Sequence, residues 1–126
     1  MNRRIDEIQA IREMYGEVEH GAEFDWLLIT RFALPEGWNR DQVEFLIVIP
    51  PGYPTTPPDN FYVAEGLRLT DGRSPNNYAE GQTVIGRSWA QFSFHAESWN
   101  PTPDPQCGDN LVSFVLAATR RLQEGA

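Results

Sequence analysis

The chain has 126 residues, 40% of them apolar, with a net charge of −8 at pH 7, four tryptophans and one cysteine. This length and composition predict one folded domain spanning residues 1–126. The acidic charge argues against nucleic acid as the main partner, because phosphate binding needs a basic face, and it favours solubility or docking onto a basic protein surface. No apolar run approaches the ~20 residues that span a bilayer. The single cysteine fits a reducing compartment, so we expect a cytoplasmic protein that does not bind a membrane.

The N-terminal segment has the apolar spacing of an amphipathic helix. The apolar residues that recur at three- and four-residue intervals are Ile5, Ile8, Ile11, Met14 and Tyr15. This spacing predicts a helix from Arg4 to Tyr15. Gly16 is a suitable residue to end it. The acidic segment from Glu17 to Glu23 contains another glycine, and we expect a loop there.

Three strands are predicted in the next segment, where they would form a small antiparallel meander. Phe24 to Phe32 is rich in aromatic and β-branched residues. Val43 to Ile49 is apolar at both alternating sets of positions, so we expect both faces of this strand to be covered. Asn60 to Val63 resumes the same composition. Five of the ten prolines lie between Pro50 and Pro58, and their missing N–H groups exclude a helix or a central strand there.

The second half of the chain is less regular until its last element. Ala64 to Gly86 is predicted to be a long irregular segment, a kind of loop that tends to be functional. The segment from Ser88 to Trp99 is rich in aromatic residues and only partly regular in its pattern. Trp89 and Trp99 within it are predicted to pack in the core. The last element is a predicted helix from Asn110 to Leu122, with Asp109 as its N-cap. This order of elements predicts an α+β domain with helices packed against an antiparallel sheet.

Four features follow one another along the chain: the turn Tyr53-Pro54-Thr55-Thr56-Pro57-Pro58, the element Ser74-Pro75-Asn76, the element Trp99-Asn100-Pro101, and an amphipathic helix directly after it. In this order they resemble the ubiquitin-conjugating enzyme (UBC) superfamily. The blocks LPEGW, IPPGYPTTPPDNFYV, SWAQFSFH and GDNLVSFVL are similar to a bacterial branch called prokaryotic family E. The resemblance implies a UBC-like fold, with a ubiquitin-like modifier and an activating enzyme as partners. It also implies transfer of the modifier's C-terminus, with docking of the activating enzyme on the first helix and the neighbouring meander.

Two departures from the superfamily pattern bear on the chemistry. Ser74 stands where the superfamily has a histidine, and no cysteine lies between Asn76 and Trp99, where the nucleophile is expected. A thioester carrier needs a thiol, so this chain either uses another group or performs no transfer. The alternative function is a non-catalytic UBC-like variant that binds or scaffolds the modifier and the activating enzyme. An unrelated α+β interaction domain is the third possibility.

Ser93 and His95 are the first candidates for the chemistry, because they lie in the window where the resemblance places the nucleophile. Histidine is the usual base for a serine hydroxyl near neutral pH, and residues two apart in an extended segment project to the same side. Ser93 would then carry the modifier as an oxyester, with His95 as its base. The structural alternative is a serine in a turn and a histidine that caps the core through a hydrogen bond.

Cys107 and Asn76 complete the candidate set. Cys107 precedes a predicted helix N-terminus, which stabilises a thiolate, whereas the neighbouring Asp104 and Asp109 oppose it. Its structural alternative is a semi-exposed cysteine in a loop. Asn76 would either donate a hydrogen bond to a developing oxyanion or hold its own loop. No role is expected for His20, and no metal site, phosphate-binding loop or cofactor is predicted.

Overall fold

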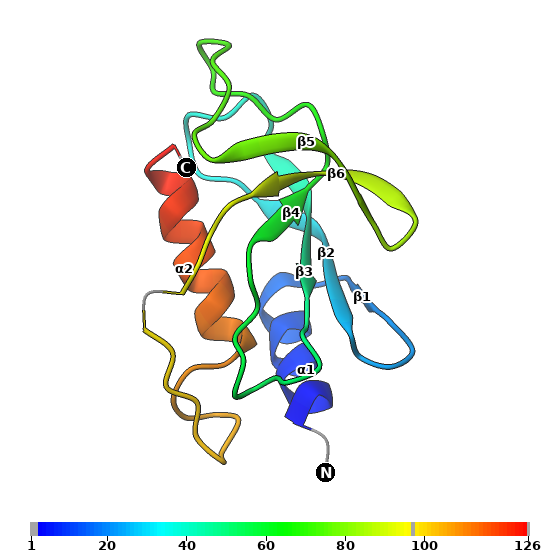
Figure 1. The fold of residues 1–126 in the computed structure, drawn as a ribbon. Coiled ribbons are helices and arrows are strands. Elements are labelled where there is room, and N and C mark those ends of the chain that lie inside the picture. The colour runs from blue at the N-terminus through cyan, green and yellow to red at the C-terminus, as the bar shows by residue number, and fades with distance from the viewer. Residues whose placement is uncertain (1–2, 97, 126) are drawn as a thin grey trace.

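A computed structural model describes residues 3–96 and 98–125. Its elements are α1 (Arg3–Tyr15), β1 (Val18–His20), β2 (Trp26–Ala33), β3 (Gln42–Val48), β4 (Phe61–Val63), β5 (Tyr78–Val84), β6 (Arg87–Phe92) and α2 (Leu111–Gln123). The strands form one antiparallel sheet in the order β1-β2-β3-β4-β6-β5, with α1 and α2 packed on it (Figure 1). This confirms the predicted α+β architecture with an N-terminal and a C-terminal helix. None of the helices in the described part of the chain has the length and apolarity required to span a bilayer.

Strand β1 lies within the segment that was predicted to be a loop. It is only three residues long and pairs with β2, with Val18 opposite Ile29. Val18 is buried in the main core, which accounts for the pairing of this short, acidic segment with the sheet.

Strand β5 corrects the prediction of an irregular segment from Ala64 to Gly86. Most of its side chains are exposed, so it lacks the alternation that marks a half-buried strand. A bulge shifts its register to β6 between Ala79 and Gln82, and Gly81 within the bulge has a φ of +81°. The Gly81 N–H donates to the Glu65 carboxylate at 2.7 Å and not to another strand.

The N-cap of α2 is Asn110, which corrects the prediction of Asp109. The Asn110 side chain accepts the Ser113 N–H at 2.8 Å, and the Ser113 hydroxyl accepts the Asn110 N–H at 2.9 Å, forming a capping box. Asp109 instead accepts the Asn100 N–H at 2.7 Å and the Ser113 hydroxyl at 3.1 Å. It therefore fastens the preceding loop to the start of the helix.

The main core lies between the sheet and the two helices. Phe45, Phe61 and Phe92 lie on neighbouring strands, and their rings stack with centroid distances of 5.0 Å for each adjacent pair. Ile8 and Ile11 reach this core from α1. The residues that α2 contributes are Leu111, Phe114, Val115, Ala118 and Leu122. The apolar spacing of α2 therefore predicted the face that it buries. On α1 the predicted stripe is only partly buried, because Ile5 and Met14 are 47% and 53% exposed.

The opposite face of the sheet carries a second, smaller apolar cluster. Leu28, Leu46 and Trp89 are 2%, 0% and 0% exposed, although neither helix contributes to this cluster. The sheet's own side chains and the β5–β6 hairpin cover them. The Arg87 guanidinium lies 4.4 Å from the Trp89 ring centroid, and the indole N–H donates to the Val84 carbonyl at 3.0 Å.

A buried carboxylate joins α1, the proline-rich turn and α2. Glu7 is 2% exposed and accepts the Leu111 N–H at 2.7 Å, the Tyr53 hydroxyl and the Arg3 guanidinium at 2.6 Å. Burial and the bond to Glu7 raise the pKa of the Tyr53 phenol, so this hydroxyl remains a donor at physiological pH. One side chain thus sets the position of the turn relative to both helices.

Candidate functional site

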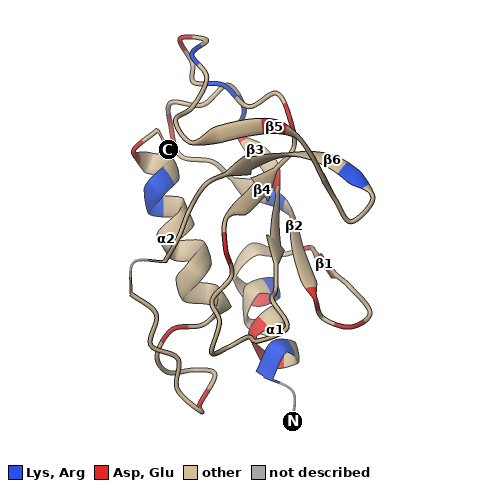
Figure 2. Ribbon diagram, viewed as in Figure 1, with Lys and Arg blue, Asp and Glu red and all other residues tan. Residues whose placement is uncertain are grey.

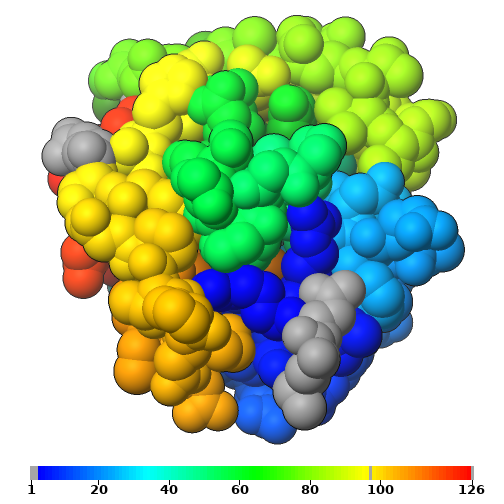
Figure 3. Space-filling view, turned by 60° about the horizontal axis from the view of Figure 1, so that its bottom comes forward, coloured from blue at the N-terminus to red at the C-terminus, as the bar shows by residue number. Residues whose placement is uncertain are grey.

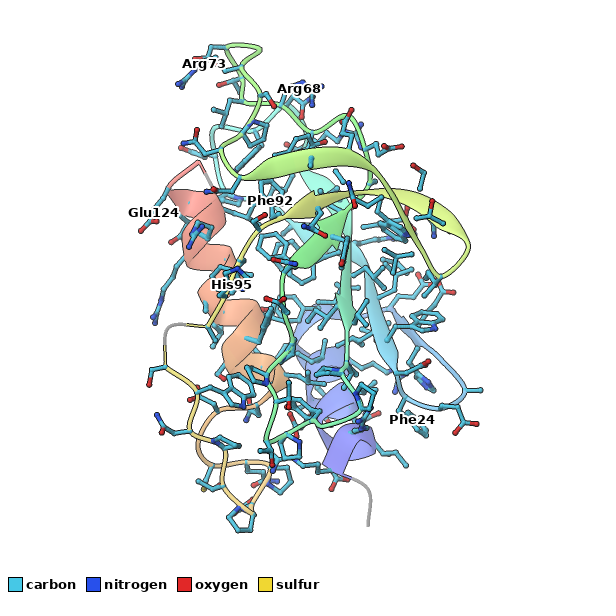
Figure 4. The ribbon with its side chains drawn as sticks, in the orientation of Figure 1. Phe24, Arg68, Arg73, Phe92, His95 and Glu124 are labelled. Atoms are coloured by element: carbon cyan, nitrogen blue, oxygen red, sulfur yellow. The ribbon has the colours of Figure 1, made fainter. Side chains whose placement is uncertain are left out.

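The segment after β6 carries Ser93 and His95 to the surface beside α2. Both residues are exposed, whereas Phe94 between them is 7% exposed, so the two candidates alternate with a core residue. Asn60 holds this segment: its N–H donates to the Phe94 carbonyl at 2.7 Å, and its side chain accepts the Phe94 N–H at 3.0 Å. Figure 4 shows His95 alongside α2, on the stretch of chain that leads away from Phe92.

The imidazole of His95 has a carboxylate partner, Asp59. Nδ1 of His95 contacts Oδ1 of Asp59, and the side chains are 74% and 66% exposed, respectively. A carboxylate at Nδ1 favours the tautomer that carries its proton there, which leaves Nε2 free to accept another. The ring is therefore held as a general base would need to be. His95 and Asp59 are 36 positions apart, so no local sequence pattern predicts that their side chains are in contact.

Ser93 lies next to the Ser74-Pro75-Asn76 element. Its N–H donates to the Asn77 carbonyl at 2.8 Å, because β5 begins at Tyr78, directly opposite the end of β6. Asn76 is exposed and adjoins this backbone contact. Among the described residues, no hydrogen bond joins the Ser93 hydroxyl to His95 or to the Asn76 side chain. Chemistry at this position would require the exposed side chains to turn toward a bound acyl group.

A pocket of about 280 Å³ lies between the segment after β6 and α2. Its apolar floor includes Phe94 and Phe114, and its rim carries His95, Arg121 and Glu124. Trp99 lines the same pocket, and its indole N–H donates to the Pro54 carbonyl at 2.7 Å. This tryptophan is half-buried and ties the pocket to the proline-rich turn.

Cys107 lies in the exposed loop before α2 and is not among the residues that line this pocket. Its Sγ lies 3.6 Å from the Asp104 carboxylate, whose negative charge and hydrogen bond raise the pKa of the thiol. A raised pKa lowers the thiolate fraction at neutral pH. Because the helix begins after Asn110, Cys107 also stands three residues outside the N-cap. These features do not favour Cys107 as a nucleophile.

The α+β fold, with its proline-rich turn and flanking helices, is compatible with that of a ubiquitin-conjugating, or E2-like, protein. The chain belongs to prokaryotic E2 family E, because the model of that family matches residues 6–124. Comparisons with curated proteins and with solved structures found no match. The family therefore supports a ubiquitin-conjugating-like role, and the assignment of residues to that role depends on the geometry above.

Proposed function

We propose that this chain is an E2-like carrier in a ubiquitin-like modification pathway. It would accept the C-terminus of a modifier from an activating enzyme and pass it on. The family match supports this role in general terms. The observation that carries the specific proposal is the contact between His95 and Asp59. His95 lies two residues after Ser93, in the segment where the superfamily's cysteine is expected and this chain has none.

Ser93 would be the acceptor. Its Oγ attacks the C-terminal acyl carbon of the modifier, which the activating enzyme presents as a thioester, so a C–O bond forms and the C–S bond breaks. The hydroxyl proton passes to Nε2 of His95 and then to the departing thiolate. Asp59 stabilises the imidazolium that exists between these steps. Asn76 would donate a hydrogen bond to the oxyanion.

The alternative is a non-catalytic variant that binds the modifier and scaffolds the activating enzyme. It is favoured by one observation: the Ser93 hydroxyl has no hydrogen bond to His95 in the described structure, and both residues are exposed. The same fold can support binding without bond formation.

An adduct assay distinguishes the two functions. The chain is incubated with activating enzyme, ATP and modifier, and the products are resolved by denaturing gel and intact mass. We expect an adduct that survives thiol reductant, is cleaved by mild base and is absent in Ser93→Ala. His95→Gln should slow its formation about 100-fold, the usual contribution of a general base. Ser88→Ala, which removes an exposed serine within β6 and leaves Ser93 in place, is the matched control and should form adduct normally.

Two other results would change the assignment. An adduct that is sensitive to reductant and absent in Cys107→Ala would move the acceptor to that cysteine. If no adduct forms while calorimetry still detects binding of the activating enzyme or the modifier, the scaffold function is the correct one.

A further inference from the structure

All the permanently cationic side chains of this chain are arginines. The sequence has ten lysine and arginine residues in total, and every one of the ten is an arginine. The codons of lysine and asparagine start with the same pair of adenines, yet the chain has seven asparagines. A bias against adenine-rich codons would have reduced both residue types, so it does not account for this choice of cation.

Contacts explain why arginine is used at some of these positions. Arg87 donates through two nitrogens to the two oxygens of the Glu44 carboxylate, at 2.7 and 3.3 Å. Arg3 donates to the Glu7 carboxylate and to the Thr102 carbonyl, both at 2.6 Å. A lysine has one nitrogen on a flexible stem and does not reproduce this forked geometry.

The fold does not require arginine at Arg120 or Arg121, near the C-terminal end of α2. Within residues 3–96 and 98–125, the exposed Arg120 side chain forms no hydrogen bond or ion pair. The Arg121 guanidinium lies 5.2 Å from the Phe94 ring centroid, a cation–π contact that an ammonium group also makes. A lysine would also keep the positive charge that favours the C-terminal end of a helix. Figure 2 shows basic residues, in blue, in this part of α2.

Both arginines lie at the proposed transfer site. They line the pocket of about 280 Å³ together with His95. The ring that Arg121 covers belongs to Phe94, the residue directly after Ser93. Figure 3 shows the segment after β6, in yellow, at the surface beside the green proline-rich turn. An acyl group on Ser93 would therefore be held one residue away from the ring that Arg121 covers.

A lysine beside this site would consume the ester that the site forms. Its neutral amine attacks the acyl carbon, a C–N bond forms, the C–O bond to Ser93 breaks, and an amine proton passes through His95 to the serine oxygen. The hydrogen bond from Asn76 to the oxyanion would assist this attack as well. An arginine guanidinium remains protonated and has no lone pair with which to attack.

Proximity makes such a side reaction fast. A side chain tethered to the same molecule acts at an effective concentration of order 1 mM. An acceptor protein at about 1 µM would then be at a disadvantage of about 1,000-fold against a lysine of the carrier itself. The carrier can keep positive charge at its site without this loss only if the cation is not a nucleophile.

We propose that Arg120 and Arg121 supply positive charge beside the site in a form that cannot accept the acyl group, so that the carrier does not modify itself. This inference rests on the proposed function, because only a carrier with a reactive ester needs such protection. It adds to that function a reason for the identity of two residues that the fold leaves free to be lysine.

The test introduces a lysine at each position. The parent chain, Arg120→Lys and Arg121→Lys are incubated with activating enzyme, ATP and modifier, treated with mild base and analysed by intact mass and peptide mapping. We expect the parent to form only base-labile adduct. Each variant should accumulate a base-stable amide at the introduced lysine, at least about tenfold above the parent level. The amide should form about tenfold faster per unit of pH between pH 7 and pH 9, because the neutral amine of a lysine increases by that factor below its pKa.

Two matched controls separate position from general amine reactivity. Arg31→Lys places the same amine on an exposed position of β2, which is three strands away from β6 in the sheet, or about 14 Å. It should form at least about tenfold less amide than Arg121→Lys, and only between molecules, so that dilution of the chain removes it. The double variant Ser93→Ala/Arg121→Lys lacks the ester and should form no amide. Circular dichroism verifies that each variant is folded.

Three results would overturn the proposal and leave the proposed function intact. They are a base-stable adduct that does not rise above the parent level in either variant, equal amide formation in Arg31→Lys and Arg121→Lys at every dilution, and amide that persists in the double variant while the parent forms its ester. A parent chain that forms no base-labile adduct would instead overturn the proposed function and this inference together.

Discussion

At the scale of single residues, Cys107 shows how one neighbour controls the reactivity of a thiol. The Asp104 carboxylate raises the pKa of Cys107, chiefly through its negative charge. Asp104→Asn removes that charge and keeps an oxygen that can accept the Gln106 N–H, as Asp104 does at 2.9 Å. The thiol pKa then falls, so more thiolate is present at pH 8. We expect Asp104→Asn to react faster with iodoacetamide at pH 8, and its rate profile to shift to lower pH.

Mass spectrometry of the alkylated chain between pH 6 and pH 10 measures this effect. Asp71→Asn is the control, because Asp71 is exposed and paired with Arg73 far along the sequence from Cys107. Its alkylation rate should equal that of the parent chain. Identical rates for Asp104→Asn and the parent would show that Asp104 does not control the thiol.

The sequence predicted only part of the candidate site. The spacing of Ser93 and His95 indicated two side chains on one side of a segment, and the buried Phe94 between them is consistent with that. Asp59 could not be predicted as the partner of His95. It follows the proline-rich turn, and only the pairing of β4 with β6 brings the two segments together. Contacts that depend on strand pairing leave no spacing signal in a single sequence.

At the scale of elements, Glu7 is the residue whose loss should loosen the most contacts. Glu7→Ala leaves the Leu111 N–H and the Tyr53 hydroxyl without their acceptor and leaves Arg3 without its carboxylate. We expect the free energy of unfolding to fall by about 3 kcal/mol. Tyr53→Phe removes one of these bonds and should cost about 1 kcal/mol.

Urea unfolding followed by tryptophan fluorescence measures both values. Gln9→Ala, at an exposed position on the same helix, is the control and should change stability by less than about 0.5 kcal/mol. A loss for Glu7→Ala no larger than that of Gln9→Ala would mean that the buried carboxylate does not hold the helices and the turn together.

The elements that the sequence predicted well are those with a strong apolar pattern. The two helices and strands β2 to β4 lie within about two residues of their predicted bounds, because each buries a regular set of side chains. β5 was missed because its side chains are mostly exposed and Gly81 interrupts it. The N-cap was misplaced by one residue, since Asp109 and Asn110 are both good capping residues and the choice depends on the bond to Ser113.

At the scale of the whole molecule, the sheet is stabilised from both faces. Trp89 is fully buried on the face that the helices do not cover, and it packs with Leu28 and Leu46. Trp89→Ala should therefore lower the free energy of unfolding by about 3–5 kcal/mol, as for a large side chain in a core. Ile85→Ala, at the exposed tip of the same hairpin, should cost less than about 1 kcal/mol.

Thermal and urea unfolding of the two variants provide the comparison. A small loss for Trp89→Ala would show that the outer cluster is an accessory covering and that the helix-side core alone determines stability. A large loss would mean that β6, which carries Trp89, is held in the sheet by packing on both of its faces.

The bulge in β5 limits the ways in which this sheet can bind an extended peptide segment of a partner. A flexible peptide is often captured by strand addition, in which its backbone continues the ladder of an open sheet edge. One edge strand of this sheet, β1, is only three residues long. The other edge strand, β5, is interrupted by a bulge at Gly81, whose N–H already donates to the Glu65 carboxylate. Neither edge provides a long regular template for a seventh strand. The tail of an incoming modifier would therefore have to be recognised by side chains, residue by residue, and its sequence would matter more than its backbone.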